Sequence, residues 1–372
     1  MRIFASIIIT QLFFFTWVSY GQTPQSDMEK KVEKIHHKIL TVDSHVDTPQ
    51  RLMAPGFDIS KRHDPEIDHS KVDFPRMKEG GMDALFFAVF VSQGNRTPEG
   101  NFQAKKRADV LFDSIYALFS KFPGEAGLAV SPSDAYKLKK QGKRAIFIGM
   151  ENGYPVGNDL SLIQEYYSKG ARYITLCHNR NNDICDSSTD STENNGLSEF
   201  GRSVVKFMNK TGMIIDVSHI SDKSFYDVIA LSKAPIIASH SCSRALCDNP
   251  RNMDDDMLRA LAKNGGVIQM CFLSAYVKKQ DPNTATVSDV VDHIDHIVRI
   301  AGIKHVGIGT DFDGGGGVIG CNDVSQMKNI TRELLKRGYT TRNIRKIWGG
   351  NLMRVMTQVN KIARKLNPPC NC

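Results

Sequence analysis

Histidine and acidic side chains recur in this sequence at the ends of short apolar runs. They are His45, Asp47, Glu151, His178, His219, His240 and Asp311. Imidazole nitrogens and carboxylate oxygens bind borderline cations such as Zn²⁺, and a catalytic site keeps one position open for water or substrate. A single structural zinc would favour cysteine-rich knuckles, and the sequence contains no C-x-x-C pair. The residue types therefore predict a metal site that performs hydrolysis.

The spacing of these residues indicates what each could do. His45 and Asp47 are two positions apart, so on a strand both side chains face the same side and can bind one ion. Glu151 has two carboxylate oxygens and could bridge two ions. Two metals about 3.5–4 Å apart polarise a carbonyl and generate hydroxide near neutral pH. Asp311 would then be the acid/base that protonates a leaving nitrogen.

Eight short runs rich in apolar and β-branched residues alternate with longer stretches of helical pattern. The runs span residues 41–47, 83–91, 144–152, 173–178, 213–219, 234–241, 265–272 and 305–313. Amphipathic segments between them span residues 101–122, 197–211, 221–232, 253–264, 288–302 and 322–338. Buried strands that alternate with helices are typical of a parallel sheet, and eight such units predict a (β/α)8 TIM barrel. A doubly wound open sheet is the alternative, but it would want a glycine-rich phosphate motif where residues 43–47 read DSHVD.

A barrel explains the positions of the polar residues. Catalytic groups of such enzymes gather at the C-terminal ends of the strands. Four of the 11 histidines fall at such ends. Each one alone is better explained as a hydrogen-bonded structural histidine, but their coincidence on several strands favours one shared site at the mouth of the barrel.

Length and composition narrow the class of protein without selecting one. The chain has 372 residues, of which 41% are hydrophobic and 24% charged, and these values argue against a disordered protein or a coiled coil. The net charge of +8 is scattered along the chain. Nucleic-acid binding would require basic residues clustered in a stripe on a known nucleic-acid-binding module. We therefore expect no nucleic-acid partner. Eight cysteines in a chain of this length do not form a dense disulfide scaffold.

The N-terminal segment has the pattern of an export signal. Arg2 precedes an apolar run over residues 3–18, and small residues precede a cleavage point after Gly21. A membrane anchor is the alternative, but the run is short for a bilayer span and contains polar side chains. We therefore expect a signal peptide over residues 1–21 and one barrel domain over residues 22–372. The mature protein would have no transmembrane span and would be periplasmic or extracellular.

Longer motifs carry a resemblance to a known family. They are residues 42–47 (VDSHVD), 149–153 (GMENG), 172–178 (RYITLCH), 215–219 (IDVSH), 234–241 (APIIASHS), 250–252 (PRN), 305–314 (HVGIGTDFDG) and 348–352 (WGGNL). With these motifs the chain resembles the renal-type membrane dipeptidases, peptidase family M19 of the amidohydrolase superfamily. The similarity extends from about residue 35 to residue 355.

The resemblance implies a site with two Zn²⁺ ions per chain. One ion would be held by His45, Asp47 and Glu151, and the other by Glu151, His219 and His240. By the same similarity, His178 would contact the substrate or the oxyanion, Arg251 would bind the carboxylate of the C-terminal residue, and Asp311 matches the family's acidic residue on the last strand.

The activity implied by the resemblance is hydrolysis of free dipeptides, with tolerance of a D-residue at the C-terminal position. A metal-bridging hydroxide would attack the scissile carbonyl, with Glu151 as the bridging carboxylate and Asp311 as proton donor. Asp313, two residues beyond Asp311, is the alternative acid.

The motifs also depart from the family: Val46 stands where Asn is common, and Cys177 precedes His178 whereas a cysteine follows the histidine in the mammalian proteins. Their disulfide pattern is therefore not expected here. Their lipid anchor is not expected either, because residues 367–372 (NPPCNC) form no hydrophobic tail.

Two other functions stay open at this point. The first is another binuclear amidohydrolase, acting on a cyclic amide, lactone, β-lactam or phosphotriester. Such relatives usually place a carboxylated lysine at the end of the fourth strand, where this sequence reads Leu-Cys-His. The second is an exported binding protein that has kept the fold without catalysis, although no expected ligand is missing. A homodimer is compatible with the sequence, since Cys370 and Cys372 could tether a second subunit.

Overall fold

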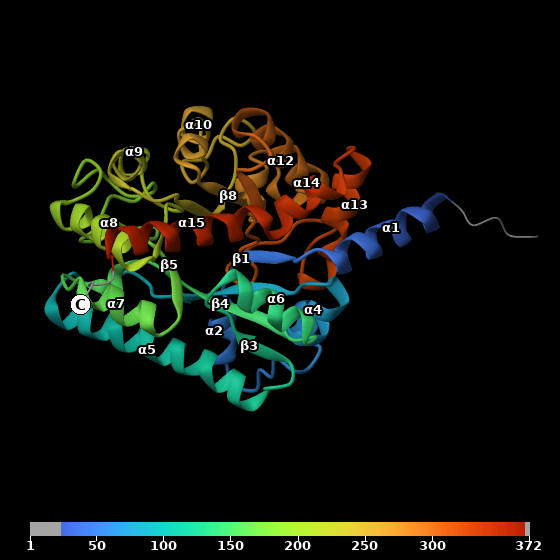
Figure 1. The fold of residues 1–372 in the computed structure, drawn as a ribbon, viewed down its shortest axis with the longest axis horizontal. Coiled ribbons are helices and arrows are strands. Elements are labelled where there is room, and N and C mark those ends of the chain that lie inside the picture. Colours follow the sequence, from blue (N-terminus) through green and yellow to red (C-terminus); the bar gives the residue numbers. More distant parts are fainter. Residues whose placement is uncertain (1–23, 369–372) are drawn as a thin grey trace, which may run out of the picture.

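Eight parallel strands form a barrel with helices around it (Figure 1). The computed structural model describes residues 24–368, so the predicted signal peptide and the pair Cys370 and Cys372 lie outside the described residues. The barrel strands, in spatial order, are β1 (Val42–Val46), β2 (Ala84–Phe90), β4 (Arg144–Glu151), β5 (Ala171–Thr175), β6 (Ile214–Asp216), β7 (Ile237–Ser241), β8 (Val267–Met270) and β9 (Val306–Ile308). Seven of the eight predicted runs contain one of these strands, and the run over residues 173–178 overlaps β5, which begins two residues earlier.

The barrel closes between β1 and the segment that follows β9. Val46 forms a parallel bridge with Phe312. The Asp311 N–H donates to the His45 carbonyl at 3.0 Å, and the Asp47 N–H donates to the Phe312 carbonyl at 2.8 Å. The predicted (β/α)8 class is therefore confirmed, and the closure holds Asp311 beside the two ligand candidates of β1.

The helices begin at residues suited to cap them. Thr97, Ser198, Ser221 and Asp254 each accept a backbone N–H in the first turn, which satisfies a donor that has no partner within the helix. The helices are α1 (Pro24–Lys38), α2 (Thr48–Leu52), α3 (Pro65–Asp68), α4 (Phe74–Gly80), α5 (Pro98–Lys121), α6 (Pro132–Lys140), α7 (Ser161–Ser168), α8 (Glu199–Thr211), α9 (Asp222–Leu231), α10 (Asp255–Asn264), α11 (Ser274–Val277), α12 (Val287–Ala301), α13 (Lys328–Lys336), α14 (Thr341–Arg345) and α15 (Asn351–Leu366). Short 3₁₀ turns span Tyr154–Val156, Pro282–Thr284 and Val324–Gln326, and a π-helical turn spans Lys346–Gly350. Among the described residues, no helix is both long and apolar enough to cross a membrane.

Two layers of buried side chains hold the barrel together. One lies between the strands and the surrounding helices. The other fills the barrel interior, where Phe86, Phe147 and Tyr173 stack, and it continues into buried residues of α15. Gly149 has to lack a side chain, because a Cβ there would lie 2.0 Å from the Tyr173 ring. This interior is packed, so the polar residues at the C-terminal strand ends are the ones left facing a cavity.

Two details differ from the sequence prediction. A ninth strand, β3 (Ala126–Leu128), pairs only with β4 and lies outside the barrel path. Its three residues are too few to show a periodic pattern. The predicted helix over residues 322–338 is interrupted, because Asp323 caps a separate 3₁₀ turn before α13 begins at Lys328.

Candidate active site

The predicted residues meet in one cavity at the C-terminal ends of the strands. The cavity has a volume of about 350 Å³, and its lining includes Asp47, Glu151, His178, His219, His240, Arg251 and Asp311. His45 is fully buried beneath it. The residues come from β1, β4 and β7 and from the segments directly after β1, β5, β6, β7 and β9. Side chains separated by up to 266 positions therefore share one site because parallel strands bring their C-terminal ends to the same face.

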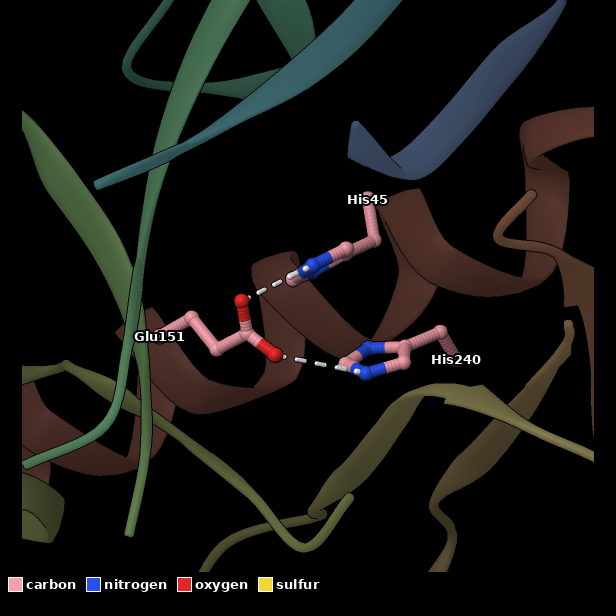
Figure 2. A group of neighbouring side chains, drawn as sticks. All are labelled: His45, Glu151 and His240. Atoms are coloured by element: carbon pink, nitrogen blue, oxygen red, sulfur yellow. Dashed lines mark ion pairs between the residues drawn. The ribbon is translucent and has the colours of Figure 1, made fainter. Parts of the chain in front are cut away.

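Glu151 lies at the centre of the histidines. Its Oε2 atom is 3.5 Å from His45 Nε2, and its Oε1 atom is 3.0 Å from His219 Nε2 and 3.5 Å from His240 Nε2. Figure 2 shows the carboxylate of Glu151 between the His45 and His240 rings, with one oxygen toward each. Its two oxygens thus serve two groups of side chains, which is the geometry that a bridging ligand requires.

The side chains of the site form three overlapping groups whose ligand atoms lie within 4.8 Å of one another. The groups are His45 with Glu151 and His240, Glu151 with His178 and His219, and His45 with Asp47 and Asp311. Together they contain all five predicted metal ligands, although they do not divide into the two predicted sets. His178 and Asp311 lie close enough to the ligands to touch a bound substrate.

Two buried atoms of the predicted metal ligands lack hydrogen-bond partners. His45 Nε2 and Asp47 Oδ1 are buried and make no hydrogen bond. A buried polar atom without a partner costs free energy, so native proteins rarely leave one unless a ligand or water binds there. Imidazole nitrogens and carboxylate oxygens are the donor set that zinc takes, so the residues present fit a metal centre.

The Nδ1 atoms of two of the histidines are occupied by neighbouring side chains. His45 Nδ1 lies 2.8 Å from the hydroxyl of Tyr173, and that hydroxyl donates to the Ser44 carbonyl at 3.1 Å. His219 Nδ1 lies 2.9 Å from Asn179 Oδ1. An Nδ1 that donates to an acceptor leaves the lone pair on Nε2, and it is Nε2 that faces Glu151 in both rings.

His240 is oriented by a longer chain of hydrogen bonds. The Ser239 hydroxyl lies 2.9 Å from His240 Nδ1 and donates to the buried Asp216 carboxylate at 2.6 Å. Asp216 also accepts the Ser239 N–H at 2.8 Å and the Thr175 hydroxyl. Since the serine proton goes to Asp216, its oxygen accepts from Nδ1. Nε2 of His240, which lies 2.8 Å from His219 Nε2, is then the nitrogen that faces the ligand cluster.

Burial and mutual charge shift the pKa values of the site in opposite directions. Burial alone would raise the pKa of Glu151, but His45 and His219 hold it well below its usual value. Burial, with Cys271 and Asp47 nearby, raises the pKa of Asp311 well above its usual value. Glu151 is therefore the anion of the site, and Asp311 is the carboxyl group that most readily holds a proton. Environments that shift the pKa values of two carboxyl groups in opposite directions are typical of acid and base pairs in active sites.

The backbone is strained at two of the site residues. His219 and Asp311 have φ angles of 72° and 63°, in the left-handed region that residues with a side chain rarely adopt. Such conformations cost on the order of 1–3 kcal/mol and cluster at functional sites. Gly314 follows in the same loop, where a Cβ would lie 2.1 Å from Asp47 Oδ2 and 2.3 Å from Asp311 Oδ1. The loop after β9 thus leaves room for both carboxylates.

Asp313, the alternative acid, has both carboxylate oxygens engaged. Oδ2 accepts from the Thr48 hydroxyl at 2.7 Å, and Oδ1 accepts from the Lys71 N–H at 2.6 Å. Asp313 also lines the cavity, but it belongs to none of the three ligand groups among the described residues. This geometry favours Asp311 as the carboxyl group that faces the reacting atoms.

Arg251 is a buried cation without an anionic partner. It is 4% exposed, and its Nε atom is buried with no hydrogen-bond partner. Nη2 donates to the His240 carbonyl at 3.4 Å, and the guanidinium lies 5.3 Å from the centre of the Tyr276 ring. In the part of the chain that the structure describes, no carboxylate pairs with it. A buried guanidinium in this state is suited to bind the carboxylate of a ligand.

Sequence reasoning missed several residues that support the site. Tyr173, Ser239 and Asp216 lie within motifs that were noted, but their spacing gave no sign that they contact ligands. Asn179 directly follows the motif of residues 172–178 and belongs to none of the motifs, so no sequence signal marked it as a contact of His219. The six described cysteines (Cys177, Cys185, Cys242, Cys247, Cys271 and Cys321) are buried free thiols.

Fold and site together define a metal-dependent hydrolase barrel. Comparison with known proteins narrows this class. The family model "Membrane dipeptidase (Peptidase family M19)" matches residues 29–369. The chain belongs to this family, and it is an enzyme of the membrane-dipeptidase-like metallopeptidase type.

Named relatives agree with the family match. The chain is 32% identical to "Dipeptidase ataJ" of Aspergillus terreus over 90% of this chain and 88% of that protein. It is 33% identical to "Dipeptidase verJ" of Clonostachys rogersoniana over 91% of this chain and 89% of that protein. Among solved structures, the probable dipeptidase PvdM from Pseudomonas aeruginosa superposes with a TM-score of 0.85 at 31% identity, covering 91% of this chain and 100% of that chain.

The Asp216–Ser239–His240 chain makes a testable prediction. Replacing Ser239 with alanine removes the hydroxyl that joins Asp216 to His240 but keeps the backbone bond to Asp216. Hydrogen bonds of this kind are worth roughly 10–100-fold in metal affinity, so we expect Ser239→Ala to release metal to a chelator at least tenfold faster. Thr175→Val is the matched control, because the Thr175 hydroxyl donates to the same carboxylate without contacting a ligand. Equal release from both variants would contradict the role of Ser239.

Proposed function

We propose that the protein is an exported dinuclear zinc dipeptidase that hydrolyses the peptide bond of free dipeptides and tolerates a D-residue at the C-terminal position. Family membership supports the dipeptide substrate and the D-residue tolerance. The donor set of three histidines and two carboxylates, with Glu151 placed to bridge, supports two zinc ions.

One observation carries the choice of substrate. Arg251 offers a buried, unpaired positive charge at one side of the cavity, and the carboxylates of Asp47 and Asp311 lie among the ligand candidates. A free dipeptide carries a carboxylate at one end and an amine at the other. Its carboxylate would bind Arg251, which sets the scissile carbonyl over Glu151 and the histidines. A neutral cyclic amide or lactone would leave Arg251 without a partner.

The residues of the chain then have distinct tasks. Bound zinc ions would supply Lewis acidity and a nucleophile formed from water near neutral pH. His45, Asp47, Glu151, His219 and His240 would hold them. His178, whose Nε2 is 3.7 Å from Glu151 Oε1, would donate to the oxygen on which negative charge develops. Asp311 would carry the proton to the leaving nitrogen.

Export and assembly complete the proposal. The signal pattern of residues 1–21 supports cleavage near Gly21 and a periplasmic or extracellular mature protein. The intact mass of protein purified from its native host should then correspond to a chain beginning at Gln22, and a mass that includes the apolar segment would favour an anchor. A homodimer stays a proposal that rests on the sequence alone.

The role of Asp311 predicts a separation of activity from metal content. In Asp311→Ala the general acid is lost, which is worth roughly 10²–10⁴-fold in rate, so kcat for L-Ala-D-Ala should fall by orders of magnitude. Metal analysis of the same preparation should still find close to two ions per chain. Normal turnover by the variant would contradict the assignment.

The role of Arg251 predicts dependence on the substrate's free carboxylate. Truncating one partner of a buried charged pair costs about 2–5 kcal/mol, so Arg251→Ala should lower kcat/KM for L-Ala-D-Ala by about 30-fold or more. The comparison substrate is the C-terminal amide of the same dipeptide, which the wild type should already cleave poorly. If the variant loses the same factor on both substrates, Arg251 acts in some way other than carboxylate binding.

A further inference from the structure

A second cavity adjoins the active site and no step described above uses it. Its volume is about 490 Å³, larger than the active-site cavity. Gln50 and Phe90 line both cavities, so these two side chains form part of the boundary between them. The far wall of the second cavity comes from the first turns of α5 and from Tyr154. Cavities of this size hold ligand groups well beyond a methyl side chain.

The barrel topology places this cavity opposite Arg251. Phe90 ends β2, whereas Arg251 lies in the segment that follows β7. In the spatial order of the eight strands, β2 is second and β7 is sixth, so they stand across the barrel from each other. A dipeptide with its C-terminal carboxylate on Arg251 would therefore direct its N-terminal residue toward Phe90 and Gln50. This step rests on the proposed function.

The boundary between the cavities carries a positive charge. Gln50 Nε2 donates to the Phe90 carbonyl at 3.0 Å, and Gln50 Oε1 accepts from Arg107 Nη2 at 2.7 Å. Among the described residues, Arg107 pairs with no carboxylate, and it also lines the second cavity. Glu99 also lines this cavity, two helical turns earlier on α5, where its Oε1 atom accepts from the Gln103 side chain at 2.7 Å. Among the side chains that line the second cavity, Arg107 is thus the cation nearest the active site.

We propose that the second cavity binds the side chain of the substrate's N-terminal residue and favours a long side chain that ends in an anionic group. The aliphatic part of such a side chain would pass Phe90, and its anion would meet Arg107 in the position that Gln50 Oε1 now occupies. The preferred substrates would be dipeptides whose first residue is extended by an acid-bearing substituent, rather than dipeptides of two small residues.

Three substrates with D-alanine as second residue test this proposal. Their first residues are L-alanine, Nε-acetyl-L-lysine and Nε-succinyl-L-lysine, so the last two match in length but differ in charge. A partly exposed ion pair is worth up to about 1 kcal/mol, or about fivefold. We expect kcat/KM for the succinyl substrate to exceed that for the acetyl substrate by about fivefold at low ionic strength, and the ratio to shrink as salt is added.

Substitutions in α5 test whether Arg107 and the second cavity cause the preference for the succinyl substrate. Arg107→Gln keeps a donor for Gln50 but removes the charge, so the ratio between succinyl and acetyl substrates should fall to about one. Lys106→Gln makes the same charge change at a neighbouring residue that does not line the cavity, and the ratio should stay at its wild-type value. Gln103→Trp places a large ring in the cavity and should lower kcat/KM for both lysine-derived substrates relative to L-Ala-D-Ala.

The outcomes separate this proposal from the proposed function. Cleavage of L-Ala-D-Ala with no preference among the three substrates, or equal effects of Arg107→Gln and Lys106→Gln, would overturn the subsite and leave the dipeptidase proposal standing. Absence of cleavage of all three by metal-loaded protein would overturn both.

Discussion

The active site depends on one buried carboxylate shared among several imidazoles. Glu151 is 4% exposed, and three histidines place Nε2 within 3.0–3.5 Å of its two oxygens. Burying an anion is costly unless cations or hydrogen bonds compensate it. A barrel can arrange this compensation, because β1, β4 and β7 direct side chains from different sides toward one point at the mouth. Tyr173, Asn179 and the pair Ser239 and Asp216 then fix which nitrogen each ring presents.

Much of the fold, and the meeting of the candidate ligands at one end of the barrel, could be predicted from the sequence. Each barrel strand is a short apolar run, and the abrupt change from apolar to polar at its end marks residues such as His45, Glu151 and His240. The i, i+2 spacing of His45 and Asp47 also predicted that their side chains face the same side, and His45 Nε2 lies 3.6 Å from Asp47 Oδ2. These features are local, so a periodic pattern reveals them.

The remaining features depend on contacts between distant segments, which no local pattern contains. Tyr173 reaches His45 across 128 positions, and the Ser239 hydroxyl reaches Asp216 across 23. The division of ligands into two sets came from family resemblance and stays a prediction, since the three groups of neighbouring ligand atoms do not assign residues to particular ions. The strand β3 was missed because three residues give no period. The choice between Asp311 and Asp313 likewise needed the structure, since only there do Thr48 and Lys71 engage Asp313.

Charge is distributed across the mouth of the barrel in a way that suits a substrate with an anionic group at each end. The unpaired guanidinium of Arg251 lies after β7, and the unpaired guanidinium of Arg107 lies beyond β2 on the opposite side. The carboxylates of Asp47 and Asp311 belong to the loops that close the barrel between them. A ligand spanning this mouth would meet cations at its two extremes and the ligand cluster at its centre.

The central claim is that bound metal at the Glu151 cluster makes this protein a dipeptidase. The most direct measurement is metal content per chain, determined on the same purified sample in which alanine release from L-Ala-D-Ala is followed before and after chelation. The account predicts two zinc ions per chain, hydrolysis that stops when the metal is removed, and recovery when zinc is returned. Hydrolysis that persists in metal-free protein, or zinc-loaded protein that cleaves no dipeptide, would contradict it.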